Sequence, residues 1–254
     1  MCGIAGIIHF NSKPVDSRKL RRMMNLLKHR GPDDEGIFVK KNFGLGHVRL
    51  SIQDLSKAGH QPMFSNDKRY CIIFNGEIYN YIELKQELVG KYKFKTKTDT
   101  EVILAAYLEW GESCLDKFNG DWAFVIYDQL KDEYFGARDR YGVKPFYYFL
   151  DHEKFIFASE IKAIVPLLIE KTENNKLIYE YLNFNRTDQS SGTFFNEVHK
   201  LKHGNKFTIK NNEYNESQWY NLQDKIISSN MSYQEYRYAL KKSIDLRLRS
   251  DVPV

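Results

Sequence analysis

The sequence predicts an α+β protein: a four-layer αββα sandwich in which two antiparallel sheets pack together and helices cover the outside. Two observations lead to this fold class. The first half of the chain alternates strands with helices, and residues 121–158 then change to short, aromatic-rich strands separated by turns. The chain has 254 residues and is 42% hydrophobic, so it can bury a core of this size.

The amino terminus is predicted to enter a strand directly. Residues 3–9 are apolar and β-branched, and a helix over residues 16–28 follows, with Asp16 placed to cap its start. One face of this helix is apolar at the spacing i, i+3, i+4, i+7, through Leu20, Met23, Met24 and Leu27.

A loop and three strands are expected next. Residues 29–36 are too polar and too rich in Gly and Pro to form a regular element. Strands over 37–40 and 44–50 follow, and a further strand over 70–74 comes after an irregular stretch. The polar sequence Asn75-Gly76-Glu77 predicts a turn that ends this strand.

The middle of the chain contains helices and then a meander. Helices are expected over 79–89 and from Thr98-Asp99 to Gly111. The remaining elements are strands over 121–128, 133–138, 145–150 and 154–158, helices over 160–168 and 177–184, and a hairpin of 206–209 with 214–220 around Asn211-Asn212.

The last stretch begins a different unit. Ser232 and Glu235 form a capping-box pair, and the helix that follows has an apolar face. After Ser250 the chain is apolar enough to begin a strand. We therefore divide the chain into a domain over 1–220 and, over 221–254, a linker with the first helix of a truncated α/β domain.

Charge and cysteine content limit the classes of function. The net charge is +5 without a basic block, so nothing indicates a nucleic-acid partner. Cys2, Cys71 and Cys114 form no CxxC or Cys/His cluster, which predicts no metal site and a reducing compartment. Because no signal peptide or membrane-length apolar run is present, we expect a cytoplasmic protein without a membrane partner.

Cys2 can combine two reactive groups on one residue. If Met1 is removed, Cys2 carries both a thiol and a free α-amine, which titrate near ~8.5 and ~8 respectively. The amine can then take the thiol proton, a known way to activate a nucleophile. Taken alone, the first four residues favour the simpler interpretation of an inert cysteine at the start of the chain.

Five motifs that follow one another along the chain favour the interpretation of Cys2 as a nucleophile. They are Met1-Cys2-Gly3-Ile4, His29-Arg30-Gly31-Pro32-Asp33, Arg49-Leu50-Ser51-Ile52, Asn75-Gly76-Glu77-Ile78-Tyr79-Asn80 and Thr98-Asp99-Thr100-Glu101.

This ordered set resembles the class II glutamine amidotransferases, the N-terminal nucleophile glutaminase domains, and most of all those of glutamine-hydrolysing asparagine synthetases. Asp121-Trp122-Ala123-Phe124, Arg138–Tyr148 and Ala158–Ala163 support the same branch. The resemblance implies the N-terminal nucleophile hydrolase fold, L-glutamine as substrate and no cofactor for the glutaminase reaction.

The resemblance also implies the roles of individual residues. Cys2 would be the nucleophile, and Asn75 and Gly76 would donate hydrogen bonds to the oxyanion, although an Asn-Gly pair alone is a common turn. The glutamine-binding residues would be Arg49, Leu50, Ser51, Ile52, Gln53, Asn75, Gly76, Glu77 and Asp99, with mainly backbone contacts from residues 50–53.

Physical arguments accompany some of these roles. The forked guanidinium of Arg49 can grip the α-carboxylate of glutamine, and Asp99 can pair with its α-ammonium or cap a helix, or do both. Arg30 and Asp33 would brace the loop that covers Cys2, with simple loop structure as an equal alternative. His47 is expected to be structural, because the amine already supplies a base.

The end of the sequence fits the same family. Ser250-Asp251-Val252-Pro253 resembles the short sequence that precedes the ATP-pyrophosphatase signature Ser-Gly-Gly-x-Asp-Ser in that family. The signature itself is not contained in the sequence. We therefore expect a missing synthetase domain, linked in cis, that would bind ATP and Mg²⁺ and use the ammonia to make asparagine. A homodimer is a further expectation.

Two alternatives remain at this point. The chain could be the glutaminase half of a sugar-modifying amidotransferase, since the loop at 188–192 departs from the family's usual pattern and leaves the acceptor open. Lys202-His203-Gly204 also departs from that pattern, which affects only the turn that it forms. It could also be a catalytically silent binding module of the same fold.

Overall fold

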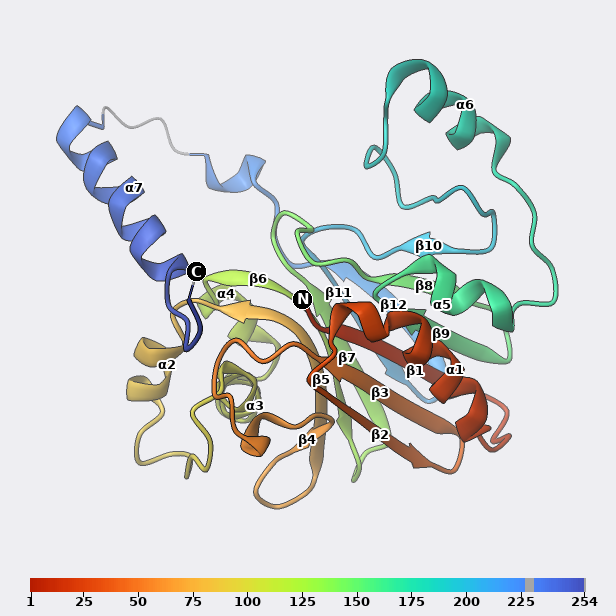
Figure 1. Cartoon of the computed structure of the whole chain (residues 1–254), viewed down its shortest axis with the longest axis horizontal. Coiled ribbons are helices and arrows are strands. Elements are labelled where there is room, and N and C mark those ends of the chain that lie inside the picture. Colours follow the sequence, from red (N-terminus) through yellow and green to blue (C-terminus); the bar gives the residue numbers. More distant parts are fainter. Residues whose placement is uncertain (227–230, 254) are drawn as a thin grey trace.

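The computed structural model of the chain describes residues 1–226 and 231–253, and within these residues a pair of six-stranded sheets pack together (Figure 1). Neighbouring strands are antiparallel throughout. The first sheet has the order β10 (His199–Lys200), β8 (Tyr147–Leu150), β9 (Lys154–Ala158), β1 (Gly3–His9), β3 (Phe43–Arg49) and β2 (Asp34–Lys40). The second has the order β12 (Glu213–Gln218), β11 (Asn205–Lys210), β7 (Glu133–Arg138), β6 (Gly120–Asp128), β5 (Tyr70–Ile78) and β4 (Met63–Phe64).

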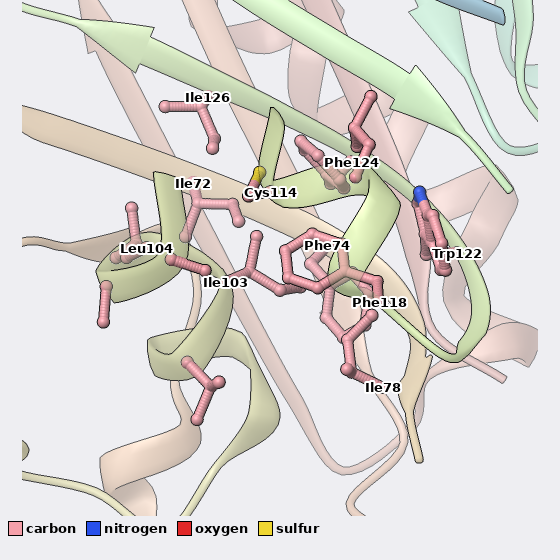
Figure 2. Close-up of a cluster of buried hydrophobic side chains, with 14 of the residues drawn as sticks. Ile72, Phe74, Ile78, Ile103, Leu104, Cys114, Phe118, Trp122, Phe124 and Ile126 are labelled. Carbon is pink, nitrogen blue, oxygen red and sulfur yellow. The ribbon is translucent and has the colours of Figure 1, made fainter. Parts of the chain in front are cut away.

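Helices cover both outer faces, as the predicted αββα layering requires. The first sheet is covered by α1 (Ser17–Leu27) and α5 (Ile161–Ile164), which share a hydrophobic cluster with β1 and β9. The second sheet is covered by α2 (Tyr81–Glu87), α3 (Asp99–Trp110) and α4 (Cys114–Lys117). Figure 2 shows this second cluster, which contains Phe74 and Phe124 of the sheet and Ile103 of α3.

A third cluster fills the space between the sheets. Ile4 and Leu45 of the first sheet meet Ile73 and Val125 of the second, and all four side chains are fully buried. Because side chains alternate along a strand, residues on one side of β5 face this space while their neighbours face the helices.

The amino-terminal elements follow the sequence pattern closely. The side chain of Asp16 accepts a hydrogen bond from the Arg18 N–H at the start of α1, and the four apolar positions of the predicted face are all buried. Helix α1 thereby packs against β1 and β3, and the strand that begins after Cys2 lies in the middle of its sheet.

The predicted turn at Asn75-Gly76-Glu77 is wrong. Strand β5 continues to Ile78, because β6 pairs with it along its whole length and places Asn75 opposite Ala123 and Gly76 opposite Trp122. A Cβ atom on Gly76 would lie 2.3 Å from the Asp121 backbone oxygen, so glycine here permits a close approach of two strands rather than a turn.

Several element boundaries also need correction. Strand β2 begins at Asp34 rather than at residue 37, because Asp34 and Glu35 pair with the end of β3. The helix expected over 79–89 is α2, two residues shorter at each end. The strand expected from 145 begins at Tyr147, and the two-residue strands β4 and β10 were not predicted.

Two helices lie outside the sandwich. Helix α6 (Asn175–Phe184) and helix α7 (Tyr233–Arg247) both project from it (Figure 1). The capping box at Ser232 and Glu235 is present as predicted. Of the unit expected over 221–254, residues 227–230 and 254 lie outside the described residues, and residues 251–252 form a bend instead of a strand.

Candidate active site

One cleft brings together most of the residues that the motifs indicated. It opens where the beginning of β1, the loop after β3, the end of β5 and the start of α3 meet. Its walls are formed by Met1, Cys2, Arg49, Leu50, Ile52, Gln53, Gly59, Gln61, Phe74, Asn75, Gly76, Glu77, Thr98, Asp99, Thr100 and Lys144. Ser51, Arg30 and Asp33 do not belong to these walls.

Cys2 stands at the entrance of β1, partly exposed to the cleft. The Leu50 N–H lies 3.4 Å from its Sγ atom, and Sγ lies 3.6 Å from the Leu50 carbonyl oxygen. Burial raises the pKa of the Cys2 thiol, and the Leu50 N–H partly opposes this because it favours the thiolate. The thiol therefore needs a base close by to react at neutral pH.

The amino group in this form of the chain belongs to Met1, which also lines the cleft. Burial lowers the pKa of this amine, so a larger fraction is unprotonated and able to accept a proton at neutral pH. In this form of the chain, the amine that could act as base is therefore close to the sulfur but belongs to the preceding residue instead of to Cys2 itself.

Arg49 holds the loop that forms one wall of the cleft. Its guanidinium donates to the carbonyl oxygens of Ser56 at 2.9 Å, Gln53 at 3.2 Å and Asp54 at 2.5 Å. A Cβ atom on Gly59 would lie 2.0 Å from Nη2, so a larger residue there would displace the guanidinium. These three bonds leave two of the five guanidinium donors without a partner among the described residues.

Asn75 is buried, and its side chain has no hydrogen bond to the described residues. Neither its Oδ1 nor its Nδ2 atom has a partner within residues 1–226 and 231–253, and both atoms are secluded from solvent. A buried carboxamide left unpaired costs about 1–3 kcal/mol, so such a residue calls for an explanation. Asn75 faces the space between the sheets at its open end, where it lines the cleft that Cys2 enters from the opposite sheet.

The backbone N–H of Gly76 points toward the same region. In an antiparallel pair, successive residues turn their N–H and C=O groups to opposite edges of the strand. The flanking N–H groups of Phe74 and Ile78 donate to Gln61 and Asp99, on the edge that faces away from β6. Gly76 lies two residues from each of them along β5, so its N–H also faces away from β6 and into the cleft.

Asp99 lies on the far wall, in the first turn of α3. Its Oδ2 accepts the Ile78 N–H at 2.9 Å, and burial raises the pKa of its carboxyl to about 7. The helix cap is Thr98, whose side chain accepts the Glu101 N–H, so the structure does not support the alternative that Asp99 caps the helix. Burial also raises the pKa of the neighbouring Glu77.

Arg30 and Asp33 hold the backbone on the two sides of the cleft entrance through hydrogen bonds. Arg30 donates through Nε to the Cys2 carbonyl oxygen at 2.9 Å and through Nη1 to Glu160 at 2.9 Å. Asp33 accepts the Ser51 N–H at 2.7 Å. One residue thus fastens the backbone of Cys2, and the other fastens the loop next to Leu50.

His47 is buried beneath the cleft rather than in it. Its Nε2 atom lies 3.0 Å from the Phe74 carbonyl oxygen, and burial lowers the pKa of His47 to about 3. The ring is therefore neutral at physiological pH and bonds to the backbone of the second sheet, which agrees with the structural role expected for it.

Four polar wall residues were not predicted. Gln61 accepts the Phe74 N–H at 2.7 Å and donates to Thr100 at 3.2 Å, which links β5 to α3. No feature of the sequence around Gln61 indicated this. Thr98, Thr100 and Lys144 do lie in the motifs at residues 98–101 and 138–148, so their position in these motifs was the available signal.

Neither a metal centre nor a membrane-spanning helix is found in residues 1–226 and 231–253. No three His, Cys, Asp or Glu side chains converge there to hold a metal ion. None of the helices within those ranges has both the length and the apolar character needed to cross a membrane.

Comparisons with known proteins agree with this geometry. A family profile described as a glutamine amidotransferase domain matches residues 1–220. A Methanocaldococcus jannaschii protein, provisionally named asparagine synthetase (glutamine-hydrolyzing) 2, is 42% identical over 278 residues, covering 100% of this chain and 53% of that protein. Asparagine synthetase (glutamine-hydrolyzing) 1 of Bacillus subtilis is 37% identical over 263 residues, covering 100% and 41%. The chain thus spans about half the length of these relatives or less.

A solved structure shares the fold. Glutamine phosphoribosylpyrophosphate amidotransferase of Bacillus subtilis, complexed with ADP and GMP, superposes with a TM-score of 0.64 at 19% identity. The superposition covers 86% of this chain and 49% of that one. At this identity the likeness concerns the fold alone.

Proposed function

We propose that this chain, which belongs to the class II glutamine amidotransferase family, hydrolyses the side-chain amide of glutamine to glutamate and ammonia. Its four-layer sandwich is the N-terminal nucleophile hydrolase fold. The observation that carries the proposal is that the Cys2 thiol and the Asn75 carboxamide, which has no partner among the described residues, line one cleft from two different sheets.

In this proposal the reaction begins after Met1 is removed. The new α-amine of Cys2 takes the thiol proton, and the sulfur forms a bond to the amide carbon of glutamine. The carbonyl electron pair moves onto oxygen, where the Asn75 carboxamide and the Gly76 N–H donate hydrogen bonds. Each such donor is commonly worth ~3–4 kcal/mol in the transition state.

The tetrahedral intermediate then loses ammonia. The protonated amine gives its proton to the leaving nitrogen, the carbon–nitrogen bond breaks, and a thioester of Cys2 remains. Water adds to the thioester with the amine again as base, which releases glutamate and restores the thiol. The proposed sequence of steps uses no metal ion or cofactor.

Opposite charges on the cleft walls support glutamine as the substrate. Asp99 would pair with the α-ammonium group, and the two remaining donors of Arg49 would bind the α-carboxylate. Backbone groups of Leu50, Ile52, Gln53 and Glu77, which all line the cleft, would complete the contacts. The side chain of Gln53, buried and also unpartnered among the described residues, offers one more polar group.

Glutamate release is the direct test. The purified chain, with its amino terminus checked by mass spectrometry, should release glutamate from glutamine, and Cys2→Ala should abolish this. Cys114→Ala is the matched control, because Cys114 is buried in the cluster between the second sheet and its helices. A glutamine-analogue diazoketone should label Cys2 alone.

Wild-type turnover in Cys2→Ala would exclude the mechanism. Absence of turnover in the correctly processed chain, with folding verified by circular dichroism, would favour the silent binding module instead.

We further propose that the ammonia serves an ATP-dependent asparagine synthetase portion that follows in cis. The two relatives are named for this activity, and this chain covers 53% and 41% of them. ATP and Mg²⁺ would be bound by that portion, where aspartate would be activated as an adenylate. A cytoplasmic location and a homodimer belong to the same proposal.

The acceptor can be tested on the longer protein. It should form asparagine from aspartate, ATP and either glutamine or ammonia, and Cys2→Ala should retain only the ammonia-dependent reaction. Amination of a sugar phosphate instead of aspartate would replace this acceptor with the alternative one and leave the glutaminase proposal intact.

A further inference from the structure

The segment that follows α7 runs back toward α2 (Figure 1), where it bonds to the loop that lines the cleft. The Asp251 N–H donates to the Ile52 carbonyl oxygen at 3.0 Å, and the Asp251 carboxylate accepts the Asp54 N–H at 2.7 Å. One residue near the end of the chain thus makes two bonds to the loop that forms the Arg49 side of the cleft.

This loop is held from both sides at the same place. Arg49 bonds to the carbonyl oxygens of Gln53 and Asp54 from within, while Asp251 bonds to the backbone of Ile52 and Asp54 from outside. The backbone of Asp54 has φ of +53°, a conformation that residues other than glycine rarely adopt. Such a conformation persists where surrounding bonds hold it.

A second attachment lies two residues earlier. Arg249 donates to both carboxylate oxygens of Glu83, each at 2.6 Å, and to the Tyr79 carbonyl oxygen at 2.8 Å. Tyr79 directly follows β5, whose last residues include Asn75 and Gly76. The guanidinium of Arg247 lies 4.9 Å from the centre of the Tyr79 ring. The end of α7 therefore also touches the wall that carries the oxyanion donors.

The rest of α7 makes no comparable attachment among the described residues. None of its side chains is buried, and Leu240 and Ile244 are both 49% exposed. Among the described residues, this helix is consequently fastened to the sandwich through Arg247 and residues 249–251.

We propose that Arg249 and Asp251 form a clasp that holds the 50–54 loop and the end of β5 in the arrangement that binds glutamine. Of these two residues, Asp251 is the one that positions the 50–54 loop. Glutamine affinity is then coupled to the position of α7. Coupling is reciprocal, so glutamine binding also tightens the clasp. The coupling to glutamine rests on the proposed function, while the clasp itself does not.

The test uses two changes at Asp251 and one control. Asp251→Ala removes the acceptor of the Asp54 N–H, and Asp251→Asn retains an oxygen that can accept it. Asp245→Ala is the matched control, because Asp245 is an exposed acidic residue of α7 for which the structure records no side-chain hydrogen bond or ion pair to the described residues.

The clasp predicts a change in glutamine binding more than in chemistry. In Asp251→Ala, KM for glutamine should rise about 5-fold or more with kcat little changed, and the Asp54 amide should exchange its hydrogen faster. Asp251→Asn should restore much of both properties, and Asp245→Ala should match the wild type.

Each outcome is decisive. Unchanged KM and unchanged Asp54 exchange in Asp251→Ala would overturn the inference while the glutaminase proposal stands. If the processed wild-type chain releases no glutamate, the proposed function fails and the exchange rate of the Asp54 amide alone decides the clasp: faster exchange supports it, and an unchanged rate overturns it.

Discussion

The thiol of Cys2 and the backbone of Leu50 face each other across the mouth of the cleft, with the Leu50 N–H 3.4 Å from Sγ. This relationship joins the beginning of β1 to the loop after β3, 48 residues further along the chain. An N–H directed at sulfur favours the thiolate. The sulfur is therefore placed where a negative charge can form once a base has taken its proton.

Retention of Met1 should slow turnover strongly. With Met1 in place, the amine is one residue away from the thiol and the Met1 side chain lines the cleft. A general base commonly contributes about 10²–10⁴-fold, so a chain that retains Met1 should be slower by at least about 10²-fold than one that begins at Cys2. The two forms can be prepared by placing a cleavable leader before Cys2 or before Met1, and equal rates from both would refute the role of the amine.

Asn75→Ala should remove activity without loss of stability. Both amide atoms of Asn75 lack partners among the described residues, so truncation breaks no hydrogen bond of the folded state. We expect kcat to fall about 10²–10³-fold, the usual effect of losing one oxyanion donor. Urea unfolding should give a free energy at least equal to that of the wild type.

Gln61→Ala is the contrasting variant. Gln61 is also buried and lines the same cleft, but its side chain bonds to Phe74 and Thr100. Its loss should lower the free energy of unfolding by about 1–3 kcal/mol. If Asn75→Ala were destabilised as much as Gln61→Ala, Asn75 would have a structural role in addition to its place in the cleft.

Asp99 should make glutamine binding depend on pH. Its pKa is raised to about 7, so below neutral pH it carries a proton and cannot pair with the substrate ammonium. Affinity should be level above about pH 7 and fall up to tenfold per pH unit below it. Titration calorimetry with Cys2→Ala, in which glutamine is not consumed, measures this directly, and an affinity independent of pH would contradict the pairing.

The raised pKa of Asp99 also predicts that the free energy of unfolding depends on pH, which gives an independent test of that pKa. Because the folded pKa lies above the ordinary value, the folded chain binds the Asp99 proton more tightly than the unfolded chain does. This contribution to stability is complete in acid and is lost as the pH rises toward about 7. Asp99→Asn should remove this component of the pH dependence.

Gln53→Leu should stabilise the protein and weaken glutamine binding. Gln53 is 8% exposed, and neither polar atom of its side chain has a partner within the described ranges. Removing an unsatisfied buried amide recovers up to about 1–3 kcal/mol, which is a rise of several degrees in Tm for a chain of this size. A higher Tm with unchanged KM would mean that the Gln53 side chain does not touch the substrate.

Local patterns were reliable where an element is defined by its own residues. The apolar face of α1, the Asp16 cap and the capping box of α7 could be recognised because each depends on residues within about one or two turns of helix. The motif set likewise indicated Cys2, Arg49, Asn75 and Asp99, which all line one cleft.

Pairing with distant segments explains the errors. An Asn-Gly pair favours a turn in isolation, yet at Asn75-Gly76 the neighbouring strand β6 keeps the chain extended. The polar residues Asp34 and Glu35 resemble a loop, but β2 is an edge strand, where polar residues are readily accommodated. Neither partner strand can be identified from the local sequence.

The class of fold, most helices and strands, and the residue types that the chemistry needs could all be inferred from the sequence, because periodicity, caps and motifs are properties of short segments. The folded structure was needed to show that Arg49 fastens a loop, that Asn75 is buried without a partner among the described residues and that Asp251 reaches Asp54. These contacts join segments up to 197 residues apart. Burial and hydrogen bonding at such separations arise when the chain is folded, so no local pattern records them.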